Sequence, residues 1–139
     1  MKASIEWTGE AGFLGKTGSG HALQMDGPPD HGGQNQGPRP MEMLLLGLGG
    51  CASFDVTLIL RRGRQQISGC RAEITAERAT EEPKVFTRIH MHFVVEGKAV
   101  DPKRVERAIS MSAEKYCSAS IMLAKTAEIT HDFEIVEAP

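Results

Sequence analysis

The chain has 139 residues, of which 40% are hydrophobic and 24% are charged, and its formal net charge is −2. This length predicts one domain with a modest core, which gains stability if it forms an oligomer. The small net charge excludes a bulk electrostatic attraction to nucleic acid or to an anionic membrane surface, so we expect neither partner.

The first 39 residues predict a small antiparallel meander followed by a loop. In residues 2–9 and 21–26, apolar and polar side chains alternate, as in strands with one solvent-exposed face. Glycine-containing turns separate these strands from a short apolar segment at Phe13. Residues 27–39 contain four glycines and three prolines, so we expect an irregular, mobile loop there.

A long central helix is predicted from Arg39 to Arg62. Pro40 suits its first turn, where the missing N–H of proline would have no partner in any case. Apolar side chains occupy almost every side of this helix, so we expect burial on several faces. Gly47, Gly49 and Gly50 each destabilise a helix by about 1 kcal/mol relative to alanine, which predicts a close approach to the backbone, for example by a second subunit.

Two features argue against a membrane location. The N-terminus, MKASIEWTGE, lacks the apolar run of a signal peptide. The apolar run from Met43 to Leu60 contains Asp55, and inserting a central aspartate costs about 2.5–3.5 kcal/mol. A core helix explains this run without a bilayer. We therefore expect a cytoplasmic protein with no membrane partner.

The second half of the chain predicts a hairpin, two helices and a final strand. Alternating patterns at 70–77 and 85–97 indicate the two strands of the hairpin, with Val85 and Thr87 among the inward-facing residues. Asp101 and Pro102 begin a helix that should extend to about residue 115, and Ser118 is expected to cap a third, shorter helix. Residues 127–137 have the one-sided pattern of a strand.

Cys51, Cys70 and Cys117 are the three cysteines, and a reducing compartment favours packing, metal binding or redox chemistry for them. Cys51 and Cys117 lie at the edges of helical structure among small neighbours, which leave a sulfur approachable. We expect Lys115 and the following helix to lower the pKa of Cys117 from about 8.5 toward neutrality. The alternative for each is packing as a small buried hydrophobe, which we expect for Cys70.

The segments PMEMLLLGLGGCASFDV and AEKYCSASIMLAK resemble the OsmC/Ohr family of thiol-dependent hydroperoxide reductases, in particular a divergent OsmC-like branch. The resemblance covers essentially the whole chain, as one domain over residues 1–139. Pro40 and Cys51 match a helix-opening proline with a cysteine eleven residues later, and Cys117 matches a cysteine before a short helix. The resemblance implies an α+β fold in an intertwined homodimer, with antiparallel sheets wrapped around long central helices and active sites at the subunit interface.

The same resemblance implies a peroxidase of the oxidative stress response that needs no cofactor. Cys51 would attack an organic hydroperoxide and become a sulfenic acid, and Cys117 would condense with it into an intrachain disulfide. An unidentified dithiol reductant would then reopen the bond. The alternative is a non-enzymatic protein of the same fold that binds a small molecule or senses redox state. A purely structural domain would leave the second cysteine without a reason.

The chain departs from the family pattern beside the helix-opening proline. Met41 stands where the organic-hydroperoxide branch has an activating glutamate, and no partner arginine can be matched. Glu42 follows one residue later, but it lies about 180° around the helix from Cys51 and cannot serve its own Cys51 directly. Ser118 replaces the proline that typically follows the second cysteine.

A further departure is Asp55, which follows Cys51 by four residues and shares its helical face. An ionised carboxylate near a thiol favours the protonated, unreactive form. Burying an unpaired Asp55 would also be unfavourable, so we expect a partner such as Arg62 or a cation from a second subunit.

His90 and His92 project from the same face of one predicted strand, a spacing that can hold a metal ion. No third ligand is apparent near them, so a solvated outer face beside Arg88 is the favoured interpretation. The chain has no Walker or dinucleotide-binding glycine pattern. We therefore expect no metal and no cofactor.

Overall fold

The computed structural model describes all 139 residues and divides them into two compact units, Met1–Leu46 and Gly47–Pro139. Helix α1 (Pro40–Arg62) begins in the first unit and ends in the second. The assignment of the whole chain to one domain stays a prediction.

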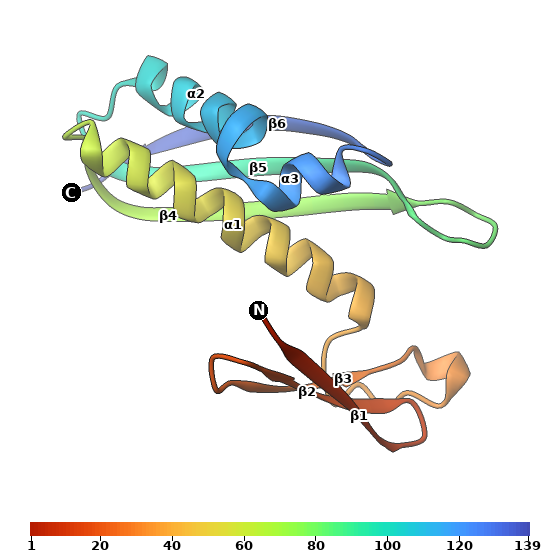
Figure 1. Ribbon diagram of the computed structural model, residues 1–139. Coiled ribbons are helices and arrows are strands. Elements are labelled where there is room, and N and C mark those ends of the chain that lie inside the picture. The colour runs from red at the N-terminus through yellow and green to blue at the C-terminus, as the bar shows by residue number, and fades with distance from the viewer. The chain divides into compact units, whose positions relative to one another are not determined.

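The first unit contains a three-stranded antiparallel sheet of β1 (Ala3–Gly9), β2 (Gly12–Thr17) and β3 (Ala22–Asp26), in that order (Figure 1). This confirms the predicted meander. Ile5 and Trp7 belong to the apolar face of β1, yet they are 60% and 66% exposed. The single chain therefore leaves the apolar face of β1 exposed.

The loop between β3 and α1 contains one helical turn and several hydrogen bonds, although its glycines and prolines predicted an irregular segment. Pro29–His31 form one 3-10 turn, η1, so the expectation of wholly irregular backbone is wrong there. The buried Asp26 carboxylate accepts hydrogen bonds from the backbone N–H groups of Gln34 (2.9 Å) and Gln36 (3.3 Å). These donors hold the pKa of Asp26 below its ordinary value.

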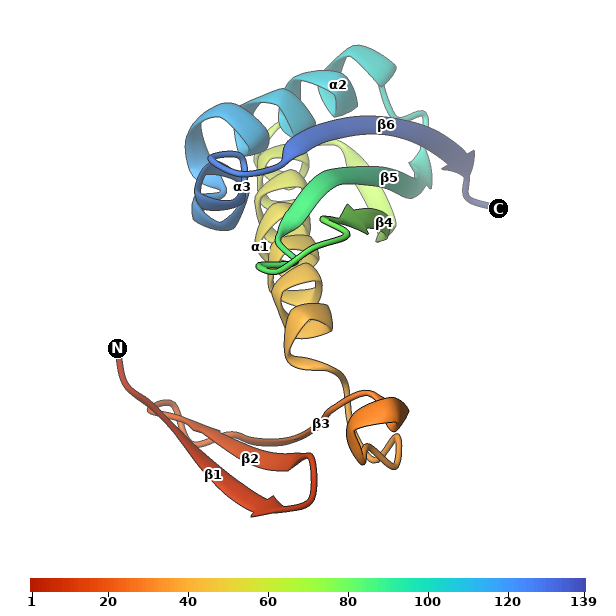
Figure 2. The same cartoon turned by 90° about the vertical axis from the view of Figure 1, so that its right-hand side faces the viewer.

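The second unit is a sheet with helices on one face (Figures 1 and 2). Strands β4 (Gln66–Arg78) and β5 (Phe86–Lys98) form the predicted antiparallel hairpin. Strand β6 (Glu128–Glu137) pairs with β5 in parallel, so this sheet is mixed and not purely antiparallel. Parallel pairing requires a crossover, which α2 (Pro102–Met111), the π-helical turn η2 (Ser112–Tyr116) and α3 (Ser118–Leu123) supply.

One stripe of α1 packs into the core of this unit. Leu48, Ala52, Val56 and Leu60, spaced four residues apart, are at most 3% exposed. The single chain therefore buries one face of the helix, and burial of its other faces by a second subunit stays a prediction. Phe54, which lies off this stripe, is 67% exposed.

The α1 glycines have different environments. A Cβ at Gly49 would lie 2.8 Å from Cδ1 of Ile74, so this glycine permits the close approach of β4 in the same chain. A Cβ at Gly47 or Gly50 would have no atom within 4 Å. The prediction that the glycines admit a close neighbour is confirmed at Gly49, where the neighbour is a strand and not a second subunit.

By length and composition alone, α1 could also cross a membrane. That test is passed equally by core helices of soluble proteins, and the buried stripe from Leu48 to Leu60 is typical of such a helix.

Strand β5 supplies more of the buried apolar side chains than any other element, with two departures from the predicted pattern at its start. Ile89, Met91, Phe93 and Val95 are buried as predicted. Val85 and Thr87, both predicted to face inward, are exposed, and Phe86 between them is buried instead. The pairing skips Thr87 between Glu77 and Arg78 of β4, and such a bulge reverses the side-chain alternation.

Candidate functional site

Two side chains of α1 meet a third from the segment between η2 and α3. The Cys51 and Cys117 sulfurs and a carboxylate oxygen of Asp55 all lie within 4.8 Å of one another. Both cysteines are free thiols. The structure thus brings together the two cysteines that the sequence singled out, together with Asp55.

Helix α1 positions Cys51 and Asp55 because residues four apart in a helix lie on the same side. Both side chains flank the buried stripe and are partly exposed. Cys117 lies between η2 and α3, where its N–H donates to the carbonyl oxygen of Ser112 (2.7 Å). Cys117 is fully buried. The exposed side of the cluster is therefore formed by Cys51 and Asp55.

The cap of α3 is Cys117, and the prediction of a Ser118 cap is wrong. The Ser120 N–H donates to Cys117 Sγ at 3.3 Å, as an N-cap side chain accepts from a first-turn amide. The N-cap of α3 therefore lies one residue earlier than predicted, directly after η2 ends at Tyr116. The second cysteine is thus held at the start of a helix.

Ser112 is a site residue that sequence reasoning missed. Its Oγ donates a 3.0 Å hydrogen bond to Asp55 Oδ2, and the serine is only 2% exposed. The expected partner of Asp55, Arg62, does not fill this position. The helical spacing of the sequence could have identified this serine, because Ser112 continues the buried stripe of Val105, Ala108 and Ile109. A buried polar side chain on such a stripe needs a hydrogen-bond partner.

Burial raises the pKa of the Cys117 thiol, since a buried thiolate loses its hydration. The contact with Ser120, whose N–H donates to the sulfur, acts in the opposite direction, and the neighbouring Cys51 raises the pKa further. The expectation that Lys115 lowers this pKa is wrong. Its ammonium group lies over the ring of Tyr116, 5.2 Å from the ring centroid.

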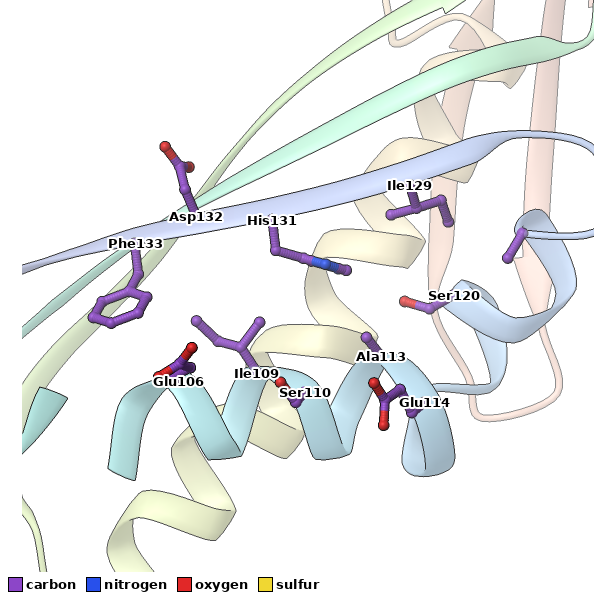
Figure 3. Close-up of a pocket in the computed structure, with 11 residues that line it drawn as sticks. Glu106, Ile109, Ser110, Ala113, Glu114, Ser120, Ile129, His131, Asp132 and Phe133 are labelled. Atoms are coloured by element: carbon purple, nitrogen blue, oxygen red, sulfur yellow. The ribbon is translucent and has the colours of Figure 1, made fainter. Parts of the chain in front are cut away.

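Ser120 also connects the cluster to a cavity of about 610 Å³ between α2, α3 and β6 (Figure 3). Its Oγ is buried and has no hydrogen-bond partner. In Figure 3 the side chains of Ser120 and His131 point toward each other across this cavity. Burial lowers the pKa of His131, with a smaller contribution from His90, which favours the neutral imidazole. The cavity thus presents a hydroxyl and an imidazole whose pKa is lowered.

Glu42 accepts a hydrogen bond at the start of α1. Its Oε1 accepts a 2.8 Å hydrogen bond from the Arg39 N–H, the contact that a residue in the first helical turn makes in a capping box. Arg39 Nη1 in turn donates to Asn35 Oδ1 (3.0 Å). This geometry gives Glu42 a helix-capping role, and an influence on Cys51 stays a prediction.

His90 and His92 lie on the outer face of the sheet, where Asp132 joins them. Its Oδ1 lies 2.9 Å from His90 Nε2 and 2.8 Å from His92 Nδ1. The sequence did not reveal this neighbour because it arrives through the parallel pairing of β5 with β6, in which His92 is opposite Asp132. The hydrogen bond to Asp132 raises the pKa of His92.

Comparisons with known proteins agree with this architecture. A family model described as OsmC-like protein matches residues 33–132. Protein YhfA of Escherichia coli (strain K12) is 44% identical over 138 residues, covering 99% of this chain and 100% of YhfA. The crystal structure of a hypothetical protein from Aquifex aeolicus VF5 is similar with a TM-score of 0.88 and 28% identity, covering 99% of this chain and 97% of that one.

A more distant likeness concerns the fold alone. The organic hydroperoxide resistance protein OsmC from Legionella pneumophila superposes with a TM-score of 0.74 at 13% identity, covering 96% of this chain and 95% of that one. The family model and the identity to YhfA both extend over the cluster of Cys51, Asp55 and Cys117. The chain therefore belongs to the OsmC-like protein family.

Proposed function

We propose that this protein is a thiol-dependent peroxidase that reduces organic hydroperoxides through Cys51 and Cys117. The observation that carries the proposal is the approach of these two sulfurs, 66 positions apart in the chain, to within 4.8 Å. The likeness to an organic hydroperoxide resistance protein supports this class of substrate. Cys51 and Cys117 are the proposed catalytic residues, whereas Asp55 and Glu42 are proposed only to modulate the site.

The exposure of the sulfurs orders the two steps. The partly exposed Cys51 is the thiol that a hydroperoxide can reach, whereas Cys117 is fully buried. The Cys51 thiolate attacks one peroxide oxygen, the O–O bond breaks, and the leaving alkoxide takes a proton to become an alcohol. Cys51 is now a sulfenic acid, oxidised by two electrons.

The second step closes the disulfide. The Cys117 sulfur attacks the Cys51 sulfenic acid, an S–S bond forms and water leaves. Because an S–S bond is about 2.05 Å long, the two sulfurs must approach each other further as it forms. The π-helical turn directly before Cys117 supports a functional role for this segment, since such turns frequently lie at functional sites. A dithiol reductant then donates two electrons and two protons to restore both thiols.

A homodimer in the cytoplasm is part of this proposal. Phe54, Tyr116 and Met122 are 67%, 47% and 71% exposed in the single chain. Large apolar side chains gathered on helices are typical of surfaces that another protein covers. We propose that a second copy of the chain covers them.

The position of Asp55 beside Cys51 and Cys117 favours a second candidate function. In it, the protein is a redox sensor of the same fold, and Cys51 is oxidised slowly. A carboxylate oxygen of Asp55 lies within 4.8 Å of both sulfurs, and a negative charge generally disfavours a second anion close to it. Rapid peroxide turnover would argue for the peroxidase, and a slow single oxidation for the sensor.

Stopped-flow oxidation with cumene hydroperoxide and hydrogen peroxide, followed by mass analysis, tests the proposal. Metal-free reduced protein should form a Cys51–Cys117 disulfide faster with the organic peroxide. Cys117→Ser should stop at a sulfenic acid that dimedone traps, and Cys51→Ser should remain reduced. Cys70→Ser is the matched control and should behave as the unaltered protein. Thiols that stay reduced in excess peroxide would refute both the peroxidase and the sensor.

A further inference from the structure

Asp55 is unfavourable for a thiolate nucleophile but favourable for a bound cation. Two thiolates and a carboxylate within 4.8 Å of one another would repel each other strongly as bare anions. A divalent cation among them reverses the sign of these interactions, because a coordinating thiol is deprotonated outright. The carboxylate that is unfavourable beside a nucleophilic thiol is therefore favourable as a metal ligand together with the two thiols.

We propose that Cys51, Asp55 and Cys117 bind a zinc-type divalent cation as a three-ligand site with one open position. Sulfur and carboxylate ligands are both usual for zinc, and three protein ligands with a fourth water is the arrangement of open zinc sites. This inference does not rest on the proposed peroxidase activity.

The dimensions of the cluster suit such an ion. Zinc binds sulfur at about 2.3 Å and carboxylate oxygen at about 2.0–2.2 Å, so two sulfurs in a tetrahedral site lie roughly 3.8 Å apart. The three ligand atoms, all within 4.8 Å of one another, need to move inward by only a small amount. Cys51 and Asp55 are partly exposed and leave an entry path, while Cys117 closes the buried side.

Two hydrogen bonds already orient the ligands. Ser112 Oγ donates to Asp55 Oδ2, which leaves the other carboxylate oxygen free for an ion. The Ser120 N–H donates to Cys117 Sγ, and an amide donor stabilises a sulfur that carries negative charge. Such partners fix the direction of a ligand, and removing one typically weakens metal binding by about 10–100-fold.

Binding and disulfide formation exclude each other. When the ion binds, each thiol loses its proton and forms a metal–sulfur bond, so two protons are released and no atom is oxidised. A disulfide between Cys51 and Cys117 would remove both thiolates. The bound ion would therefore protect the pair from peroxide, and oxidation would release the ion.

Cobalt(II) titration of reduced, anaerobic protein tests the site. We expect one equivalent to produce the near-ultraviolet thiolate-to-cobalt charge-transfer band and the strong visible bands of a tetrahedral site, with displacement by zinc. Cys51→Ser and Cys117→Ser should each reduce the charge-transfer band, and Cys70→Ser should leave it unchanged. Asp55→Asn and Ser112→Ala should each weaken binding about tenfold or more.

Circular dichroism of each variant separates loss of the ligand from loss of the fold. The inference is overturned if no charge-transfer band appears, if Asp55→Asn binds cobalt as tightly as the unaltered protein, or if Cys70→Ser loses the band. The peroxide assay on metal-free protein separates the two proposals. Protein that binds cobalt but resists peroxide would refute only the peroxidase, and protein that is oxidised but gives no band would refute only the metal site.

Discussion

Ser112 joins the two halves of the cysteine cluster: its Oγ donates to Asp55 Oδ2 at 3.0 Å while its carbonyl oxygen accepts from the Cys117 N–H at 2.7 Å. One buried serine thus connects α1 to the start of α3. The position of the Cys117 sulfur relative to Asp55 depends on this residue.

Replacing Ser112 with alanine should destabilise the protein by about 1–3 kcal/mol, because the partly buried Asp55 carboxylate loses its donor. Urea unfolding followed by circular dichroism measures the change. Ser110→Ala, at an exposed position of α2, is the control and should stay within about 0.5 kcal/mol of the unaltered protein. Equal stabilities of the two variants would show that the Ser112 hydrogen bond contributes nothing.

Replacing Asp55 with alanine should increase the thiolate fraction of Cys51 at a given pH, because a neighbouring negative charge is removed. Ultraviolet absorbance of the thiolate, recorded with a chelator in a Cys70→Ser, Cys117→Ser background, measures this fraction. Asp55→Asn, which keeps the size of the side chain, should act in the same direction. An unchanged or smaller thiolate fraction in both variants would reject the electrostatic role of Asp55.

The glycines of α1 provide a matched pair for packing. Gly50→Ala should stabilise the helix by up to about 1 kcal/mol, since its Cβ meets no atom within 4 Å. Gly49→Ala should gain less or lose stability, because Ile74 Cδ1 lies 2.8 Å from the new Cβ and must shift. Thermal unfolding compares the two. Destabilisation by Gly50→Ala would instead indicate that a second chain packs on this position.

The outer-face cluster predicts a pH dependence. Asp132 raises the pKa of His92, and His92 and His90 lower the pKa of Asp132. The stabilisation linked to His92 is complete below the ordinary histidine pKa of about 6.5 and is lost as pH rises through the raised value. The stabilisation linked to Asp132 is complete above the ordinary aspartate pKa of about 3.9 and is lost as pH falls through the lowered pKa. Both contributions are therefore present between about pH 3.9 and pH 6.5.

NMR titration of the His92 ring checks this prediction. Asp132→Asn should lower the pKa of His92, because the hydrogen bond to Asp132 is the main cause of its elevation. Glu134→Gln should lower it less, since Glu134 lies 3.5 Å from His92 against 2.8 Å for Asp132. If Asp132→Asn leaves the titration of His92 unchanged, the ion pair does not form in solution.

Local sequence rules were sufficient for the starts of the helices and for most strands. Pro40 opens α1, and Asp101 caps α2 by accepting from the Lys103 N–H at 2.9 Å, as the sequence predicted. The four-residue spacing of Cys51 and Asp55 is enough to place both on one side of α1. These features depend on residues within one or two helical turns of each other, and backbone sterics and local hydrogen bonds determine them.

Local rules failed where distant segments act on each other. The bulge at Thr87 arises from pairing with β4, and the Asp132 that joins His90 and His92 arrives by parallel pairing with β6. No single segment of the sequence contains either relationship. Register and crossover are decided by which faces must be buried together, and this depends on the whole unit.

By itself, the sequence determined the family resemblance, the two cysteines and the presence of a carboxylate beside the first of them. Only the tertiary structure decided that Cys117 is buried, that Ser112 holds Asp55, and that both sulfurs and the carboxylate share one small volume. The physical reason is that a reactive group's charge and accessibility depend on neighbours supplied by other elements, and chain order does not specify those neighbours.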